Sequence, residues 1–191
     1  KNSPVLNKYN FIYSNNKLTL THNNEELISI SPDNTEERSL LSNKLTELES
    51  SLIKPITLLK NSDFPFYDTS NSMNIFNSMS LVNLNSIKDF EKKINDKVEF
   101  QRFRANFYVD GIEPWEERNW IGKIIKINSV SFKVERNIPR CVAINLKPKT
   151  DENALNLLRL LKNTYNHFDM GVYLTALNDG KIETENKVDI N

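Results

Sequence analysis

The sequence predicts a mainly β fold with peripheral helices, an α+β protein built on an antiparallel, barrel-like sheet. About ten short runs alternate apolar and polar residues, which is the two-residue period of a β-strand. Three or four segments have helical spacing instead, but helices and strands never alternate regularly as they do in parallel βαβ proteins. With 191 residues, of which 38% are hydrophobic, the chain can bury a substantial core.

The first sixty residues contain the first strands and one helix. "KLTLT" (17–21) and "ELISIS" (26–31) alternate apolar and polar residues on either side of a turn at "HNN". Ser31-Pro32-Asp33 then marks the start of a helix, and "PITLLK" (55–60) is predicted to be a strand. Leucines recur in the helix at the spacing of one face, namely Leu40, Leu41, Leu45, Leu48 and Leu52.

A polar, proline-containing segment at 61–72 is predicted to be a loop. The segments after it are predicted as a strand at "MNIF" (73–76), a short helix at "NSMSLVNLN" (77–85) and a second helix starting at "SIKDFEKKI" (86–94). The remaining strands are predicted from alternation at 104–110, 121–127, 130–134, 140–146, 171–177 and 186–190. Asn128-Ser129 is the expected turn of a hairpin between 121–127 and 130–134. Asp151 is the expected cap of a helix over 151–163.

The amino-acid composition argues against several classes of function. Twenty-five basic residues balance twenty-five acidic ones, so the chain lacks the basic excess of a general nucleic-acid-binding protein. No apolar run approaches the ~20 residues that span a bilayer, and no secretory leader is seen. A single cysteine is typical of a reducing compartment, so we expect a cytoplasmic protein without membrane or nucleic-acid partners.

Three short motifs could carry chemistry. In "QRFRANF" (101–107), alternation would place Arg102, Arg104 and Asn106 on one face of a strand, where they could bind an anion or a heterocycle. The alternative is a solvated strand edge. In "NSMS" (77–80), the polar groups at a helix start could receive a phosphate, or could simply cap the helix; they are Asn77, Ser78 and Ser80.

The third motif is "PRC", which holds the single cysteine, Cys141. A cysteine early in an apolar strand is most often a small buried hydrophobic residue. The adjacent Arg140 favours the thiolate form that binds metals. Neither His22 nor His167 belongs to a recognisable metal motif, and a structural role is expected for His167.

These motifs together resemble the MOSC family, named after the C-terminal domain of molybdenum cofactor sulfurase. "RFRANFYVDGIEPWEERNWIGKIIKINSVSFKV" is similar to that family's Arg-x-Arg-x-Asn strand and barrel hairpin. "RCVAINLKPKT" matches the position of its molybdenum-binding cysteine, and "NTYNHFDMGVYLTALNDGKIETENKVDI" resembles its closing strand. The resemblance is best to a bacterial stand-alone branch, related to the amidoxime-reducing component.

The resemblance implies a MOSC-type β-barrel that binds the molybdenum cofactor, a molybdenum–pyranopterin. Cys141 would be the catalytic metal ligand, and the cofactor would be bound by Arg102, Arg104, Asn106, Arg140, Asn77, Ser78 and Ser80. The implied activity is an oxidoreductase that reduces small N-hydroxylated or N-oxide substrates, with electrons from a flavoprotein, a ferredoxin or a cytochrome b5-like protein. Pyridoxal phosphate binding is a further association of the family.

Two departures from the family pattern qualify this expectation. The early "PxKS/G" and Gly-Asp-Arg motifs do not occur, and Lys147 stands where the family often has an aspartate. We therefore expect residues 1–60 to be a remnant of the family's N-terminal β-rich region with one helix, and 61–191 to be the core domain. The alternatives are a sulfur-carrier or cofactor-delivery module with a persulfide on Cys141, or a non-catalytic interaction domain whose pocket is filled by side chains.

Overall fold

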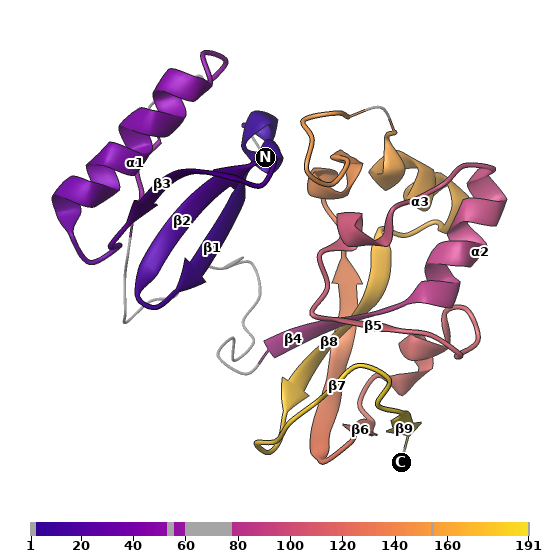
Figure 1. Cartoon of the computed structure of the whole chain (residues 1–191). Helices are drawn as coiled ribbons and strands as arrows, with labels where there is room; N and C mark the ends of the chain where they lie inside the picture. The colour runs from indigo at the N-terminus through magenta and orange to yellow at the C-terminus, as the bar shows by residue number, and fades with distance from the viewer. Residues whose placement is uncertain (1–2, 53–55, 60–77, 154, 191) are drawn as a thin grey trace. The chain divides into compact units, whose positions relative to one another are not determined.

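The computed structural model describes residues 3–52, 56–59, 78–153 and 155–190. The chain divides into two compact units (Figure 1). Unit 1 comprises residues 1–68 and 146–154, and unit 2 comprises residues 69–145 and 155–191. None of the helices in the described ranges is long and apolar enough to cross a membrane.

Unit 1 contains a three-stranded antiparallel sheet in the order β1 (Asn10–Ser14), β2 (Lys17–His22) and β3 (Glu25–Ile30), preceded by the 3₁₀ helix η1 (Pro4–Lys8). Both hairpin turns consist of two asparagines at positive φ, which are Asn15 (49°), Asn16 (59°), Asn23 (51°) and Asn24 (67°). Tight two-residue hairpin turns favour this conformation, and asparagine tolerates it better than most residues do. The strands predicted at 17–21 and 26–31 are confirmed.

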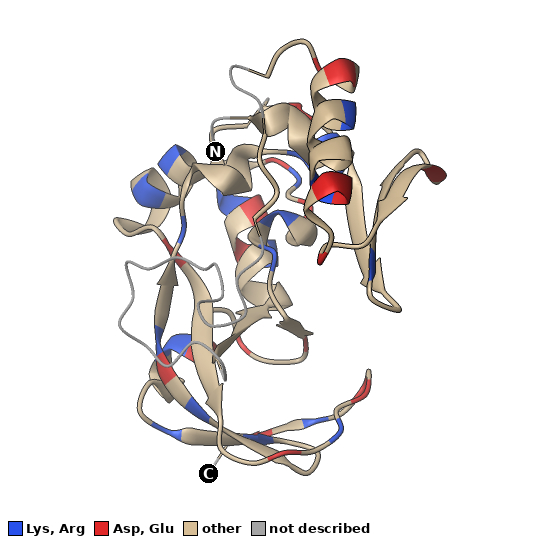
Figure 2. Ribbon diagram, turned by 90° about the vertical axis from the view of Figure 1, so that its left-hand side faces the viewer, with Lys and Arg blue, Asp and Glu red and all other residues tan. Residues whose placement is uncertain are grey.

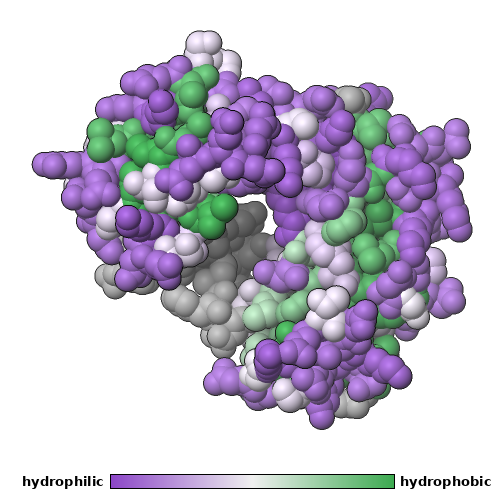
Figure 3. Space-filling model, in the orientation of Figure 1, coloured by the Kyte–Doolittle hydropathy of each residue, from purple (hydrophilic) through white to green (hydrophobic). Residues whose placement is uncertain are grey.

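Helix α1 (Thr35–Leu48) packs on this sheet and begins at Asn34, whose side chain accepts hydrogen bonds from the N–H groups of Glu36 and Glu37. Leu41 and Leu45 are buried in the core of unit 1. Leu40 and Leu48 are 55% and 40% exposed, so the leucine stripe is only partly used for packing. Figure 3 shows apolar surface in this part of unit 1. Residues 56–59 do not form the predicted strand, and 61–76 lie outside the described residues.

Unit 2 contains a six-stranded mixed sheet in the order β5-β4-β8-β7-β6-β9, curled into a half-barrel. The strands are β4 (Ser78–Asn83), β5 (Phe107–Val109), β6 (Ile124–Ile127), β7 (Val130–Pro139), β8 (Asp169–Ala176) and β9 (Val188–Ile190). The predicted α+β class is therefore confirmed. One correction concerns the pair β4–β5, which is parallel because the connection between the two strands contains a helix.

The two faces of this sheet pack on separate cores. Leu81 and Val82 are adjacent in β4, and they point into different cores. One core lies inside the half-barrel, and the other lies under helices α2 (Leu84–Ile94) and α3 (Leu157–Tyr165). Gly171 in β8 has a φ of 81°, and a Cβ there would lie 2.3 Å from the carbonyl oxygen of Leu81. The close approach of β4 and β8 therefore requires glycine at this position.

Three further predictions were wrong. Residues 78–83 form a central strand rather than a helix, and α2 begins only after them, capped by Asn83. The strand predicted at 140–146 does not form, since β7 ends at Pro139 and a short 3₁₀ helix, η5 (Val142–Asn145), follows. Helix α3 is capped by Asn156 rather than Asp151. In each case contacts with neighbouring strands or helices, rather than the local sequence pattern, determine the structure that forms. The hairpin at Asn128-Ser129 is confirmed.

Candidate functional site

Cys141 is exposed, and it lies outside the sheet. Strand β7 pairs with β8 as far as Pro139, which is opposite Asp169. The Arg140 N–H still donates to the Phe168 carbonyl at 2.8 Å, and the chain then leaves the sheet and forms the 3₁₀ helix η5 from Val142. The sequence-based reading of Cys141 as a buried strand residue is therefore wrong, and its thiol is accessible to a ligand.

Arg140 fixes the position of the cysteine next to it. Its Nε and Nη2 donate to the carbonyl oxygen of Met170, and its Nη1 donates to that of Phe103 at 2.8 Å. The guanidinium also lies over the Phe103 ring, 5.5 Å from its centre. Burial lowers the pKa of Arg140 to about 10, so it stays charged at neutral pH. Its donors are used inside the protein, which makes Arg140 a positioning residue.

The two arginines of the predicted strand do not act together. Arg102 is buried in the 3₁₀ helix η3 (Phe100–Phe103), where its Nε contacts Glu99 at 2.6 Å and its Nη1 donates to the Asn145 carbonyl. Arg104 is exposed and has a φ of 49°. The expected alternation on one face is wrong, because the strand begins only at Phe107.

The structure nevertheless brings two of the predicted motifs together. The Asn106 Oδ1 accepts hydrogen bonds from the Ser80 N–H at 2.9 Å and from its hydroxyl at 2.8 Å. Ser78 lies two residues earlier in β4 and is half-buried, and Asn77 lies outside the described residues. Because Ser78 and Ser80 are in a strand, they are not the helix caps that the sequence suggested.

Ser80 belongs to a row of polar residues that crosses three strands, β4, β8 and β7. Tyr173 of β8 is opposite Ser80, and Arg136 of β7 is opposite Tyr173 with its guanidinium 5.0 Å from the centre of the ring. Met170, which binds Arg140, precedes Tyr173 by three residues, or roughly 10 Å along a strand. Sequence reasoning missed Tyr173 and Arg136, and the polar–apolar alternation of 171–177 was a signal for Tyr173 alone.

A second polar network is buried beneath α2. Glu117, in the 3₁₀ helix η4 (Glu116–Trp120), is fully buried and accepts hydrogen bonds from the Ser86 hydroxyl and the Asn83 side chain. Ser86 also accepts from the N–H of Trp115 at 2.8 Å. Burial raises the pKa of Glu117 despite these donors. Trp115 has a φ of 68°, which is unusual for a bulky residue and is maintained by its contacts with α2.

His167 contributes to an aromatic cluster beside this network. It stacks on Tyr165 with ring centres 5.8 Å apart, and its Nδ1 accepts from the N–H of Asp169 at 3.1 Å. Tyr165 and Trp115 both donate to the Asp89 carboxylate at 2.8 Å. The His167 ring is thus held in place by its contacts with Tyr165 and with the main chain of Asp169.

Acidic and basic residues are interspersed along the ribbon in Figure 2. Within the described ranges, no three His, Cys, Asp or Glu side chains are grouped so that they could hold a metal ion.

Comparison with known proteins relates this site to a family. The MOSC domain profile matches residues 68–189, which is more than half of the chain. A molybdenum cofactor sulfurase from Drosophila willistoni is 30% identical over 108 residues, which cover 55% of this chain and 13% of that protein. The chain thus spans only a small part of this relative.

Two solved structures are also similar, YiiM from Geobacillus stearothermophilus and YiiM from Escherichia coli. Each is 15% identical with a TM-score of 0.45, and each alignment covers 59% of this chain and 53% of the other. On the strength of the domain match, the chain belongs to the MOSC domain family.

Proposed function

We propose that this protein binds a molybdenum–pyranopterin cofactor through Cys141 and reduces N-hydroxylated or N-oxide substrates. The observation that carries the proposal is the exposed thiol of Cys141, held in place by an arginine whose side chain is fixed between two main-chain carbonyls. A soft thiolate suits molybdenum, and an exposed one leaves room for a large cofactor.

The residues present fit such a group in part. Cys141 would supply the thiolate, and the exposed Arg104 and Asn106 would meet the polar groups of the pterin and its phosphate together with Ser80. Ser78 would be a further hydrogen-bonding group. Arg102 and Arg140 are engaged in internal contacts, so they support the site without binding the cofactor.

The chain itself would hold the cofactor and orient it. Arg140 fixes the main chain on both sides of the site, because it links the end of β7 to Phe103 and to β8. Its guanidinium is held by the carbonyls of Phe103 and Met170, so it fixes the main chain next to Cys141. When bound, the cofactor supplies oxygen-atom chemistry: an N–OH group takes up two electrons and two protons and becomes N–H plus water. A flavoprotein, ferredoxin or cytochrome b5-like donor would supply the electrons.

Metal analysis tests this proposal. The protein would be produced in cells that synthesise the cofactor, and molybdenum would be measured per chain in wild type, Cys141→Ala and the surface control Arg159→Ala. We expect molybdenum in wild type and in the control, its loss in Cys141→Ala, and slower maleimide labelling of Cys141 in the loaded protein. Equal molybdenum in Cys141→Ala and wild type, or none in any of them, would refute the proposal.

The same exposed thiol favours a second candidate function, a sulfur carrier with a persulfide on Cys141. The sulfurase relative supports this candidate by name, although the match covers only 13% of that protein. A carrier would release cyanide-reactive sulfur from wild type but not from Cys141→Ala, in protein that contains no molybdenum. Absence of such sulfur after incubation with a cysteine desulfurase and cysteine would exclude the carrier role.

A further inference from the structure

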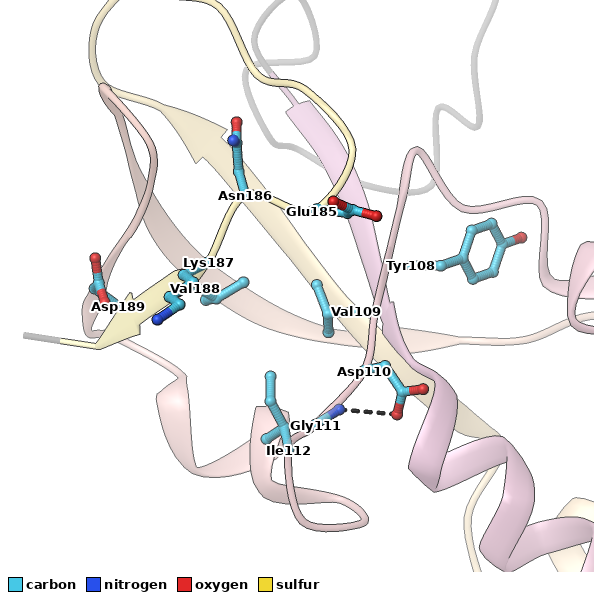
Figure 4. Close-up of a pocket in the computed structure, with 10 residues that line it drawn as sticks. All are labelled: Tyr108, Val109, Asp110, Gly111, Ile112, Glu185, Asn186, Lys187, Val188 and Asp189. Atoms are coloured by element: carbon cyan, nitrogen blue, oxygen red, sulfur yellow. Dashed lines mark hydrogen bonds between the residues drawn. The ribbon is translucent and has the colours of Figure 1, made fainter.

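A groove separates the two edges of the curled sheet in unit 2. Strand β5 ends the sheet on one side, and β9 ends it on the other. A pocket of 590 Å³ is lined by residues 108–112 and by residues 185–189. A second pocket of 340 Å³ continues it along residues 106–109, Ile127, residues 182–186 and Val188. Figure 4 shows β9 and the loop before it on one side of the pocket, and Val109, Asp110, Gly111 and Ile112 on the other.

Both walls of the groove are sheet edges. Among the residues that the structure describes, β5 pairs with β4 alone and β9 pairs with β6 alone. Successive residues of a strand direct their N–H and C=O groups to opposite sides, so a strand with a single neighbour leaves about half of these groups without a ladder partner. The Gly111 N–H and the Ile112 carbonyl are already bonded by the side chains of Asp110 and Asn85. The main-chain groups that the groove offers to an occupant are therefore those on the outer edges of β5 and β9 themselves.

The floor of the groove is apolar. Val109, Ile112 and Val188 pack against the core inside the half-barrel but remain only partly buried. The side chain of Tyr108 points away from the pocket in Figure 4. An occupant with an apolar side chain every second residue could therefore cover the open part of this core.

The rim of the groove is mainly acidic. Asp110, Glu183, Glu185 and Asp189 line it together with a single base, Lys187. Lys88 and Lys181 pair with Asp110 and Glu183, whereas Glu185 and Asp189 form no ion pair with any residue in the described part of the chain. The rim thus retains negative charge that a basic occupant would complement.

We propose that this groove binds an extended segment of a partner protein with alternating apolar and basic residues, which adds as a strand between β5 and β9. Apolar side chains would cover Val109, Ile112 and Val188, and basic ones would face Glu185 and Asp189. The part of the groove along residues 106–112 is long enough for about five or six residues of extended chain. The inference does not depend on Cys141, because none of its residues belongs to the cysteine site.

The probe is a fluorescein-labelled peptide, acetyl-Val-Lys-Val-Lys-Val-Lys-amide, titrated with the whole chain and followed by fluorescence anisotropy. We expect saturable binding, and slower hydrogen exchange of amides in β5 and β9. Lysine substitution at both Glu185 and Asp189 should weaken binding by roughly tenfold or more. The matched control, Glu25→Lys with Glu26→Lys, alters net charge equally in unit 1 and should not affect binding. Because reversed charges could disturb folding, Glu185→Gln with Asp189→Asn provides a milder pair that should also weaken binding.

A second peptide separates strand addition from simple charge attraction. It carries the same side chains but is N-methylated at every residue, which removes the main-chain donors along both edges of the strand. The proposal predicts that this peptide does not bind. Equal binding of both peptides, no binding of either, or dimerisation of the chain through β5 or β9 in sedimentation experiments would overturn it.

Discussion

Two regions of unit 2 use their polar side chains in opposite ways. At the end of the sheet where β7 finishes and β8 begins, the side chains of Arg140, Glu117 and Ser86 are all satisfied by internal hydrogen bonds. At the groove between β5 and β9, Glu185 and Asp189 form no ion pair with any described residue. Cys141 lies in the first region, but its side chain is exposed to solvent like those of Glu185 and Asp189 in the second.

This difference separates residues that maintain the architecture from residues that are available to ligands. A buried polar group loses its hydration, so its removal leaves partners unsatisfied and costs stability. An exposed polar group keeps most of its hydration on folding, so its substitution should change ligand binding without changing the stability of the fold. The four predictions below test this division, starting with the largest effect.

Arg140→Ala should cause the largest loss of stability. The substitution leaves the carbonyl oxygens of Met170 and Phe103 without their donors, which should cost about 3–5 kcal/mol of unfolding free energy. Urea denaturation followed by tryptophan fluorescence measures this in unit 2, since both tryptophans, Trp115 and Trp120, lie there. Arg159→Ala is the control, and a loss as small as in that variant would show that Arg140 is not structural.

Ser86→Ala should have the next largest effect. Ser86 donates to the Glu117 carboxylate and accepts from the N–H of Trp115, so its removal disturbs two buried groups. We expect a loss of about 2 kcal/mol in the same urea experiment. A change below about 0.5 kcal/mol would mean that water replaces the hydroxyl and that the network is not structural.

Glu117→Gln should stabilise the protein only above about pH 4.5. Burial raises the folded-state pKa of Glu117 above the ordinary value of 4.5, so the native state binds the proton more tightly than the unfolded state does. Stability therefore falls as the pH rises from about 4.5 through the folded pKa, by about 1.4 kcal/mol for each pKa unit between the two states. Glutamine has no proton to lose, so the variant should gain stability at neutral pH.

The measurement is the unfolding free energy of both proteins from pH 4 to pH 8. The curves should converge below about pH 4.5, where the carboxyl group is protonated in both states. A constant difference between the curves at all pH values would instead indicate altered packing, and a wild type that gains on the variant as pH rises would reverse the inferred direction of the pKa.

The sequence was a good guide to the elements and a poor one to where the site residues point. Alternation located β2, β3, β8 and the β6–β7 hairpin, because strand period is a local property. It failed for Arg102, which lies in a 3₁₀ helix, and for Ser80, which lies in a central strand rather than at a helix start. Those outcomes depend on contacts with Asn145 and Tyr173, which are distant in the sequence.

The family resemblance compensated for part of this failure. It pointed to Cys141 as a metal ligand, whereas local pattern favoured a buried strand residue. The structure shows the residue exposed, and its role as a ligand stays a prediction. It could not reveal the anchoring of Arg140, because the two acceptors are main-chain carbonyls that any residue could supply. The groove is equally invisible to pattern, since it arises from the curl that leaves β5 and β9 as opposite edges of one sheet.

Cys141→Ala should have the smallest effect on stability and therefore gives the sharpest comparison with its neighbour. An exposed side chain that fills no space in a core should change the unfolding free energy by less than about 0.5 kcal/mol. Because Cys141 is the only cysteine, its reaction with a thiol reagent can be followed without interference, and it should be about as fast in native protein as in urea. Slow labelling of the cofactor-free native protein, or a loss of stability approaching that of Arg140→Ala, would mean that the cysteine is part of the architecture. Fast labelling with unchanged stability would leave binding as the property for which the thiol matters.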